Sequence, residues 1–152
     1  MVKAEIIKHH LDFMEFACFL LTLDKWLLRK PISEGKWSSV EIIGHLAAWD
    51  EFVLRDRIPY FFRRNAFPAG PDVVIFNEQA ALTAREIEVI FVIDAFLNGR
   101  IQLVEWLREI PRELWFAEIK INQSTLTLSS YFKGLMEHDL HHMGQIKRII
   151  KC

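Results

Sequence analysis

Four long stretches of the sequence carry apolar residues at alternating intervals of three and four, the pattern of an amphipathic helix. They run from Lys3 to about Arg29, from Ser38 to Pro59, from Thr83 to Ile110 and from Ser129 to Lys151. Residues 111–127 are polar and β-branched, which predicts a long connection with a brief extended piece. No alternating stretch is long enough to build a sheet, so the sequence predicts an all-α, four-helix bundle.

The breaks between these stretches predict where the helices begin and end. Pro31 ends the first helix. Capping boxes, in which a hydroxyl residue is followed three positions later by a glutamate, begin the second and third helices at Ser38–Glu41 and Thr83–Glu86. The strongest break, residues 65–72, contains two prolines and a glycine and predicts a loop. A short helix is expected after it, from Val73 to about Leu82.

Composition limits the size of the fold and the kinds of partner. A chain of 152 residues that is 51% hydrophobic can bury one core and is too short for two ordinary domains, so we expect a single domain over residues 1–152. The 19 lysines and arginines nearly balance the 20 aspartates and glutamates. This balance argues against nucleic acid or an anionic membrane as a partner and favours a small molecule or a protein.

The cysteines and the lengths of the apolar runs indicate in which cellular compartment the protein is expected. Cys18 and Cys152 are the two cysteines, which is no disulfide framework and fits a reducing environment. Cys18 falls on the apolar stripe expected for the first helix, so we expect a buried, inert thiol, and Cys152 a frayed terminus. The charged N-terminus lacks a signal-peptide core, and the apolar run 16–23 is far short of the roughly 20 residues that span a bilayer. A cytoplasmic protein is expected.

Three of the six histidines suggest a metal site. His138 and His142 lie one turn apart on the last predicted helix, about 40° around its axis, with Gln145 between them. His45 lies on the apolar stripe of the second predicted helix and is expected to point inward. Facing helices of a bundle build metal sites from such side chains, and neutral imidazoles bind zinc, nickel or iron. Three protein ligands leave room for water or substrate, as in catalytic sites.

Two alternatives stay open at this level. His45 could be a hydrogen-bonded core histidine, with the histidines of the last helix forming a polar surface patch. His141 lies about 60° from His138, so these two could form the pair instead. The sequence lacks the glutamate of an H-E-x-x-H motif, which excludes that class of metalloprotease. His9 and His10 are expected at the surface.

Other polar and aromatic residues are weaker candidates. Asp94, an acid within an apolar stretch, could orient a ligand histidine or face water. Trp49 could line a substrate pocket, although a core aromatic is the better interpretation. A group of arginines near the end of the second helix could hold an anion, but cations there usually complement the helix dipole. The group consists of Arg55, Arg57, Arg63 and Arg64.

Two motifs carry a family resemblance. K-W-S-S-V-E-I-I-G-H-L-A-A-W, residues 36–49, resembles the start of the second helix in the DinB-like superfamily, especially its ClbS/DfsB-type branch. His138-x-x-x-His142-x-x-Gln145 resembles that superfamily's final-helix motif. The resemblance implies a four-helix bundle with a long crossover between helices 2 and 3, often dimeric. It also implies a divalent metal, held by motif match at His45, His138 and His142.

The resemblance and the residues together give a functional expectation. Relatives in that superfamily include thiol-dependent transferases and isomerases that use bacillithiol or mycothiol, and a hydrolase that opens a cyclopropane in a toxin. We expect a metal-dependent hydrolase or thiol-dependent transferase that acts on a small electrophilic molecule. Zinc or nickel would sit at His45, His138 and His142, with Gln145 orienting a ligand or the bound water, and the protein would be a homodimer. The alternative is a non-catalytic stress-response or binding protein with a structural or vestigial histidine cluster.

Overall fold

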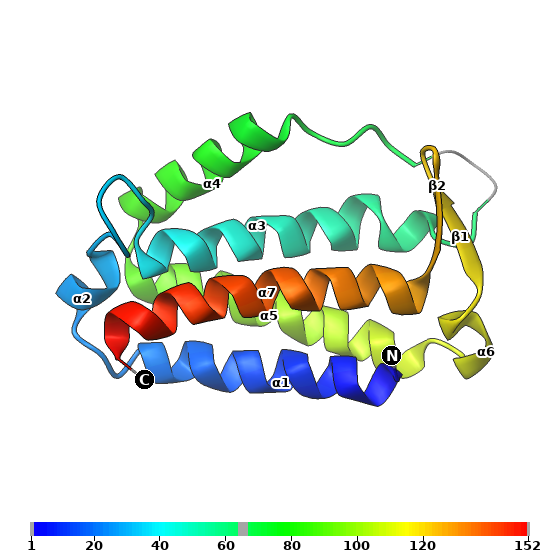
Figure 1. Cartoon of the computed structure of the whole chain (residues 1–152), viewed down its shortest axis with the longest axis horizontal. Coiled ribbons are helices and arrows are strands. Elements are labelled where there is room, and N and C mark those ends of the chain that lie inside the picture. The colour runs from blue at the N-terminus through cyan, green and yellow to red at the C-terminus, as the bar shows by residue number, and fades with distance from the viewer. Residues whose placement is uncertain (1, 64–66, 152) are drawn as a thin grey trace.

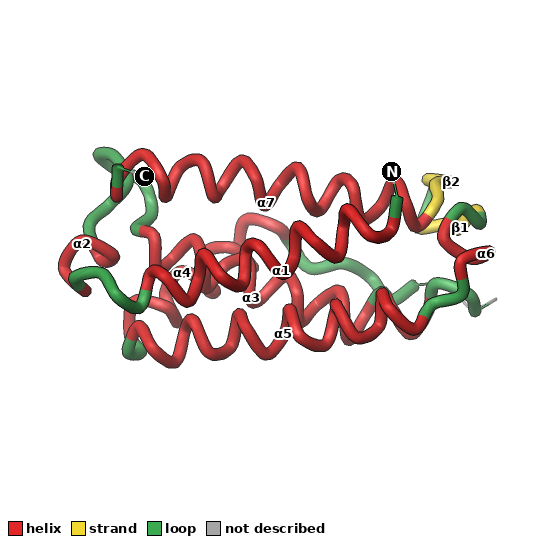
Figure 2. The backbone as a smooth tube through the Cα atoms, turned by 90° about the horizontal axis from the view of Figure 1, so that it is seen from below, coloured by secondary structure: helices red, strands yellow, loops and turns green. Residues whose placement is uncertain are grey.

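Four long helices lie side by side along the molecule and confirm the predicted bundle (Figures 1 and 2). The computed structural model describes residues 2–63 and 67–151. The bundle helices are α1 (Lys3–Leu20), α3 (Ser39–Asp56), α5 (Val89–Glu109) and α7 (Leu128–Ile150). Each buries one side against the others.

The long crossover between α3 and α5 is also confirmed, and it carries a helix of its own. This helix, α4 (Val73–Glu86), lies on the outer side of α3 (Figure 1). Asp72 begins it, since its Oδ1 accepts a hydrogen bond from the Ile75 backbone N–H at 3.1 Å. The expected capping box at Thr83 is therefore wrong, because Thr83 lies inside α4, and the break before α5 falls at residues 87–88.

The start of α3 agrees with the sequence, whereas the end of α1 does not. Ser38 Oγ accepts a hydrogen bond from the Glu41 backbone N–H at 3.2 Å, as the capping box predicts. The first helix was expected to reach Arg29 but ends at Leu20, and a separate short helix, α2 (Lys25–Arg29), follows. Asp24 caps α2 by accepting from the Trp26 N–H at 2.7 Å, so the chain turns where the sequence pattern suggested continuity.

The expected buried side of α1 is wrong. The buried residues are Ile6, Phe13, Ala17 and Leu20, whereas Cys18 and its neighbours on the expected stripe are exposed or half-buried. Both stripes satisfy the three-and-four spacing, because α1 is apolar on most sides. The stripe that the structure buries includes His9 and His10, so their expected surface position is also wrong.

The connection before α7 contains the extended piece that its composition indicated. After a short helix, α6 (Arg112–Trp115), strands β1 (Glu118–Ile121) and β2 (Ser124–Thr127) form an antiparallel hairpin. A single 3-10 turn, η1 (Ile58–Tyr60), contains Pro59 at the end of α3. The hairpin lies at the opposite end of the bundle from α2 (Figure 1). None of the helices within the described ranges is both long and apolar enough to cross a membrane.

The close approach of α4 to α3 gives a stability prediction. A β-carbon on Gly44 would lie 2.7 Å from the Ala84 Cβ, whereas one on Gly134, in α7, would meet nothing within 4 Å. Gly44→Ala should push α4 away and lower the free energy of unfolding by about 1–3 kcal/mol. Gly134→Ala is the matched control and should raise it by about 0.5–1 kcal/mol. Urea unfolding measures both, and shifts of the same sign would contradict this packing.

Candidate metal centre

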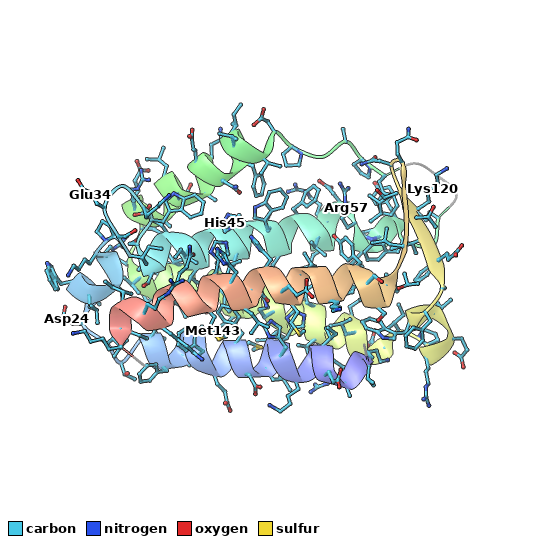
Figure 3. The ribbon with its side chains drawn as sticks, in the orientation of Figure 1. Asp24, Glu34, His45, Arg57, Lys120 and Met143 are labelled. Atoms are coloured by element: carbon cyan, nitrogen blue, oxygen red, sulfur yellow. The ribbon has the colours of Figure 1, made fainter. Side chains whose placement is uncertain are left out.

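Three imidazoles meet between α3 and α7. His45 projects from α3 toward α7 (Figure 3), and His138 and His142 lie one turn apart on α7. The ring centroid of His45 is 5.5 Å from that of His138 and 5.1 Å from that of His142, and the latter two are 4.6 Å apart. Each residue offers a ring nitrogen within 4.8 Å of the others. The structure thus brings together three side chains that the sequence offered as candidate ligands.

The depth of the three rings differs. His45 is 3% exposed, His142 is half-buried and His138 is exposed, so the cluster opens toward solvent along α7. Trp37 packs its ring 4.9 Å from the His45 ring. The loop before α3 holds Trp37 there: its backbone oxygen accepts from the Ile32 N–H at 2.8 Å, and Gly35 takes the left-handed conformation that this tight loop requires, with φ +73°.

The polar atoms of the cluster fit a divalent cation. Both ring nitrogens of His45 are buried without a hydrogen bond of ordinary geometry in the described structure, although the Asn77 amide lies close enough to favour the charged ring slightly. An unsatisfied buried polar atom is destabilising unless a partner arrives. His138 Nε2 and His142 Nε2 are 3.2 Å apart. Two nitrogens that share a tetrahedral zinc ion with ordinary bond lengths lie about 3.3 Å apart, so the pair needs little movement.

Gln145 selects one tautomer of His142. Its Oε1 lies 2.8 Å from His142 Nδ1 and can only accept a hydrogen bond, so Nδ1 carries the hydrogen. The lone pair of His142 then lies on Nε2, which faces His138. A partner that fixes the far nitrogen of an imidazole is the usual support of a histidine ligand. Gln145 therefore contacts His142 at the ring nitrogen that faces away from His138.

Burial keeps the three imidazoles neutral. It lowers the pKa of His45 to about 4, with smaller contributions from His142 and His138. Burial is also the main reason that the pKa values of His138 and His142 are lowered. Metal ions compete with protons for imidazole nitrogens, so rings that resist protonation remain available as ligands at neutral pH.

A small cavity opens beside His142, which is the one of the three histidines among its lining residues. It has a volume of about 160 Å³. His142 and Gln145 line it from α7, and the loop that carries Trp37 contributes most of the other residues. The lining residues are Ile32, Gly35, Lys36, Trp37, Ile42, His142 and Gln145.

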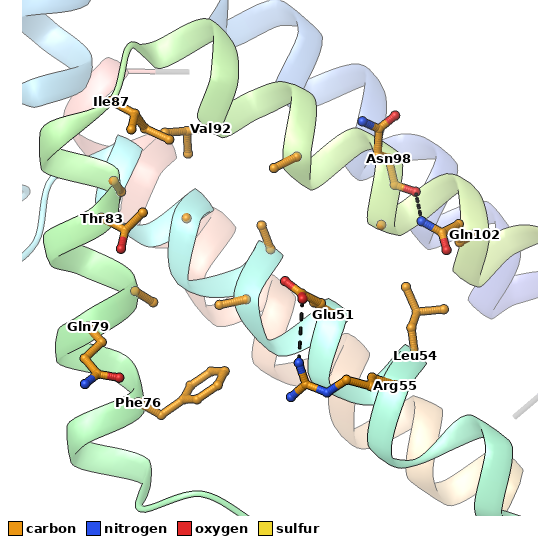
Figure 4. A pocket seen from close by; sticks show the side chains of 17 residues that line it. Glu51, Leu54, Arg55, Phe76, Gln79, Thr83, Ile87, Val92, Asn98 and Gln102 are labelled. Atoms are coloured by element: carbon orange, nitrogen blue, oxygen red, sulfur yellow. Dashed lines mark hydrogen bonds and ion pairs between the residues drawn. The ribbon is translucent and has the colours of Figure 1, made fainter.

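A larger cavity lies elsewhere, between α3, α4 and α5, and has a volume of about 720 Å³ (Figure 4). Alanines and glycines form much of its lining, and the described residues around it include no histidine. Its charged residues, Glu51 and Arg55, are exposed and lie 3.7 Å from each other. Size alone does not provide reactive groups, so we place the candidate chemistry at the smaller cavity.

A second cluster of buried polar residues lies beside the imidazoles and was missed by the sequence analysis. Arg100, on α5, donates from Nε to Asp50 on α3 at 2.7 Å, and from Nη1 and Nη2 to the two oxygens of Asp139 on α7 at 2.6 and 2.8 Å. His9 Nε2 lies 2.8 Å from Asp139 Oδ2, and His10 Nδ1 accepts from Arg100 Nη1 at 2.9 Å. All four bundle helices therefore meet at one guanidinium.

The guanidinium takes the position that a second metal ion would need. His9, His10 and Asp139 each bring a possible ligand atom within 4.8 Å of the others. Arg100 Nη1 already donates to Asp139 and His10, however, and its charge would repel a metal cation. We therefore treat this cluster as an internal ion network.

The charges in this network depend on one another. Burial alone would lower the pKa of Arg100, but Asp50 and Asp139 hold it above its ordinary value. Burial alone would raise the pKa of Asp139, but Arg100 and then His9 hold it below its ordinary value. Asp50 makes one hydrogen bond to Arg100, and burial raises its pKa to about 6. Burial and then the Arg100 charge lower the pKa of His10 to about 3.

The sequence contained a signal for this network. Arg100, Asp50 and Asp139 each occupy the buried side of an amphipathic helix. Arg100, for example, lies four residues after Phe96 and three before Leu103, both of which are buried. A charged residue at such a position requires a buried partner. His45 shows the same signal on α3.

The weaker candidates lie away from the imidazoles or have structural contacts. Asp94 is exposed and accepts from the Asn98 side chain at 3.4 Å, so it faces water. His141 is exposed on α7, with its ring 5.3 Å from that of His142, and does not belong to the group of three. Trp49 is half-buried; its ring packs against α4, and its Nε1–H donates to Asn77 Oδ1 at 2.8 Å.

The arginines near the end of α3 have separate partners. Arg57 is buried, and its guanidinium lies 4.5 Å from the Phe52 ring centroid. Arg55 is exposed and pairs with acids on its own helix, and Arg63 is exposed near the following turn. Arg64 lies outside the described residues, as does Cys152. The described arginines therefore do not converge on one anion.

Comparison with known proteins agrees with this architecture. The family profile described as the DinB superfamily matches residues 14–146. Among solved structures, the chain is similar to YfiT from Bacillus subtilis, described as a probable metal-dependent hydrolase with an unusual four-helix bundle topology. The TM-score is 0.78, over 98% of this chain and 86% of YfiT, at 13% sequence identity. That identity supports the fold alone, and no curated protein sequence matches the chain significantly.

Because the buried His10 resists protonation, acid should destabilise the metal-free protein. An unfolded histidine takes up a proton near pH 6.5, whereas the pKa of folded His10 is about 3. As the pH falls from 6.5 to 4.5, the stability advantage of wild type over His10→Asn should shrink by up to about 1.4 kcal/mol per pH unit. Asparagine preserves an acceptor for Arg100. Urea unfolding in the presence of chelator measures the stability difference between wild type and each variant. For Gly134→Ala, the control, this difference should not change with pH. A difference for His10→Asn that does not change with pH would contradict the lowered pKa of His10.

Proposed function

This chain belongs to the DinB superfamily, and we propose that it is a metal-dependent hydrolase of a small electrophilic molecule. Its metal, zinc or nickel, would be held by His45, His138 and His142. The proposal agrees with the described character of YfiT, whose fold this chain shares. It rests on the donor set of this chain, since three neutral imidazoles suit a borderline cation and leave coordination positions open for reactants.

One observation carries the proposal. His45 is buried with no ordinary hydrogen bond at either ring nitrogen, and two further imidazoles of lowered pKa lie against it. Buried histidines usually have their nitrogens paired, because unpaired buried polar atoms are destabilising. His10 leaves one ring nitrogen without a hydrogen bond in the described structure, whereas His45 leaves both. A cation shared with His138 and His142 would supply the missing partner.

The other residues of the cavity have roles that follow from their positions. Gln145 holds His142 with Nε2 directed toward His138. Trp37 covers the buried ring of His45, and Lys36 adds a positive charge to the lining, which favours substrates with negative charge near the reacting group. A divalent cation there would supply Lewis-acid chemistry, polarising the electrophile and activating water.

The size of the cavity favours hydrolysis over transfer from a thiol cosubstrate. Its volume is about 160 Å³. Pockets for drug-sized ligands start at roughly 300 Å³, so this cavity suits a small substrate with water better than a substrate together with a second organic molecule.

Metal binding tests the site directly. Protein prepared without chelator should contain one zinc or nickel ion per chain. His45→Ala, His138→Ala and His142→Ala should each weaken zinc binding by more than about 100-fold, since even the loss of a ligand's supporting residue weakens binding 10- to 100-fold. His141→Ala is the control and should bind as wild type does. Chelator competition measures the affinities. An absence of stoichiometric metal, or an equal loss in His141→Ala, would reject the site.

Turnover tests the reaction class. Zinc-loaded wild type should hydrolyse members of a panel of small esters, lactones and epoxides without added thiol, and His138→Ala should lose this activity. Adding a low-molecular-weight thiol should not increase the rate. A rate that depends strictly on thiol would contradict hydrolysis and indicate a transferase. Metal binding without turnover of any panel member would favour a non-catalytic binding protein.

A further inference from the structure

We propose that Arg100 is a positioning residue: it fixes α3 against α7 and thereby keeps His45 within reach of His138 and His142. This inference rests on the proposed metal site, because it concerns how that site is held. Arg100 belongs to a third helix, α5. It donates a hydrogen bond to none of the three imidazoles in the described structure, and its charge acts directly on His138 alone among them, so a positioning effect would pass through the two helices that it joins.

The contacts of Arg100 are directional. The planar guanidinium donates two hydrogen bonds to Asp139, at 2.6 and 2.8 Å, and a third, at 2.7 Å, to Asp50. It is 2% exposed, so water does not weaken these interactions by screening. A two-pronged contact between planar groups restricts rotation as well as distance. An apolar contact of the same size would tolerate sliding of one helix along another much more readily.

The two carboxylates stand on the helices that carry the imidazoles. Asp139 is the neighbour of His138 and precedes His142 by three residues on α7. Asp50 follows His45 by five residues on α3. A shift of either helix by one residue would move its imidazoles by about 1.5 Å along the axis and turn them by about 100°. Bonding both carboxylates to one side chain therefore constrains both halves of the proposed site.

Further contacts hold the guanidinium itself in place. It lies 4.7 Å from the Phe96 ring centroid and 5.4 Å from that of Phe13, and His10 accepts one of its hydrogens. His9 Nε2 lies 2.8 Å from Asp139 Oδ2, the oxygen that also accepts from Arg100 Nη1. The carboxylate beside His138 is thus held from α5 and from α1 together.

The variant Arg100→Lys distinguishes a positioning role of Arg100 from a role in balancing buried charge. Arg100→Lys keeps a buried cation for Asp50 and Asp139 but lacks the planar fork that contacts both oxygens of Asp139. If the fork sets the register, this variant should fold and still bind metal poorly. Leu103→Ala is the matched control: Leu103 lies three residues further along α5 and is 1% exposed, so its truncation should destabilise the bundle without touching the ion network.

Two readouts test the inference at a temperature where all variants are folded. The first is zinc affinity by chelator competition, with the visible spectrum of the cobalt-substituted protein. Arg100→Lys should bind zinc about 10- to 100-fold more weakly than wild type and show an altered cobalt spectrum. Leu103→Ala should bind as wild type does, even where urea unfolding shows it to be the less stable variant. Wild-type affinity in Arg100→Lys, or losses that follow stability in both variants, would overturn the inference.

The second readout needs no metal and separates this inference from the proposed function. In metal-free wild type, ring centroids 5.1 and 5.5 Å apart should give nuclear Overhauser effects from His45 to His142 and His138. These effects should disappear in Arg100→Lys and persist in Leu103→Ala. A wild type that binds no metal but shows this pattern would reject the metal site and support Arg100 as the positioning residue. Unchanged effects in Arg100→Lys would reject the positioning role.

Discussion

The arrangement of this bundle depends on the hydrogen bonds and ion pairs that the buried guanidinium of Arg100 makes. Its partners come from α1, α3 and α7, so one side chain of α5 touches every other bundle helix. Removing charges from water is unfavourable, and deleting one partner of such a network typically costs about 3–5 kcal/mol, because the remaining charge stays buried and unpaired. The apolar core supplies the drive for the helices to associate, whereas the ion network rejects arrangements in which its members do not meet.

This constraint links the core of the protein to its candidate chemistry. Asp139 contacts Arg100 on α5, whereas its neighbour His138 contacts His45 on α3. One turn of α7 therefore carries both a member of the ion network and a proposed metal ligand. The described interior contains two polar clusters, the ion network around Arg100 and the group of three imidazoles. In one, the carboxylates already have a permanent cation in Arg100. In the other, three neutral imidazoles have none, and His45 keeps both nitrogens unsatisfied in the described structure.

The sequence predicted what depends on local spacing and missed what depends on how helices meet. His45, His138 and His142 could be found because their positions on two amphipathic helices are set by helical periodicity alone. The phase of α1 could not be fixed in this way, because two of its sides are apolar, and its early end depends on a hydrogen bond that Asp24 makes to the following backbone. Asp50, Arg100 and Asp139 were visible as charges at buried positions, but pairing them requires knowing which helices are neighbours.

The central claim is that the imidazoles of His45, His138 and His142 bind one ion together. X-ray absorption spectroscopy of the zinc-loaded wild-type protein tests it most directly, because imidazole rings give a characteristic scattering pattern that reports how many of them bind the metal. The account predicts three imidazole ligands per zinc, with the remaining positions filled by oxygen. A shell with fewer than three imidazoles, or one that contains sulfur from the exposed Cys18, would contradict it.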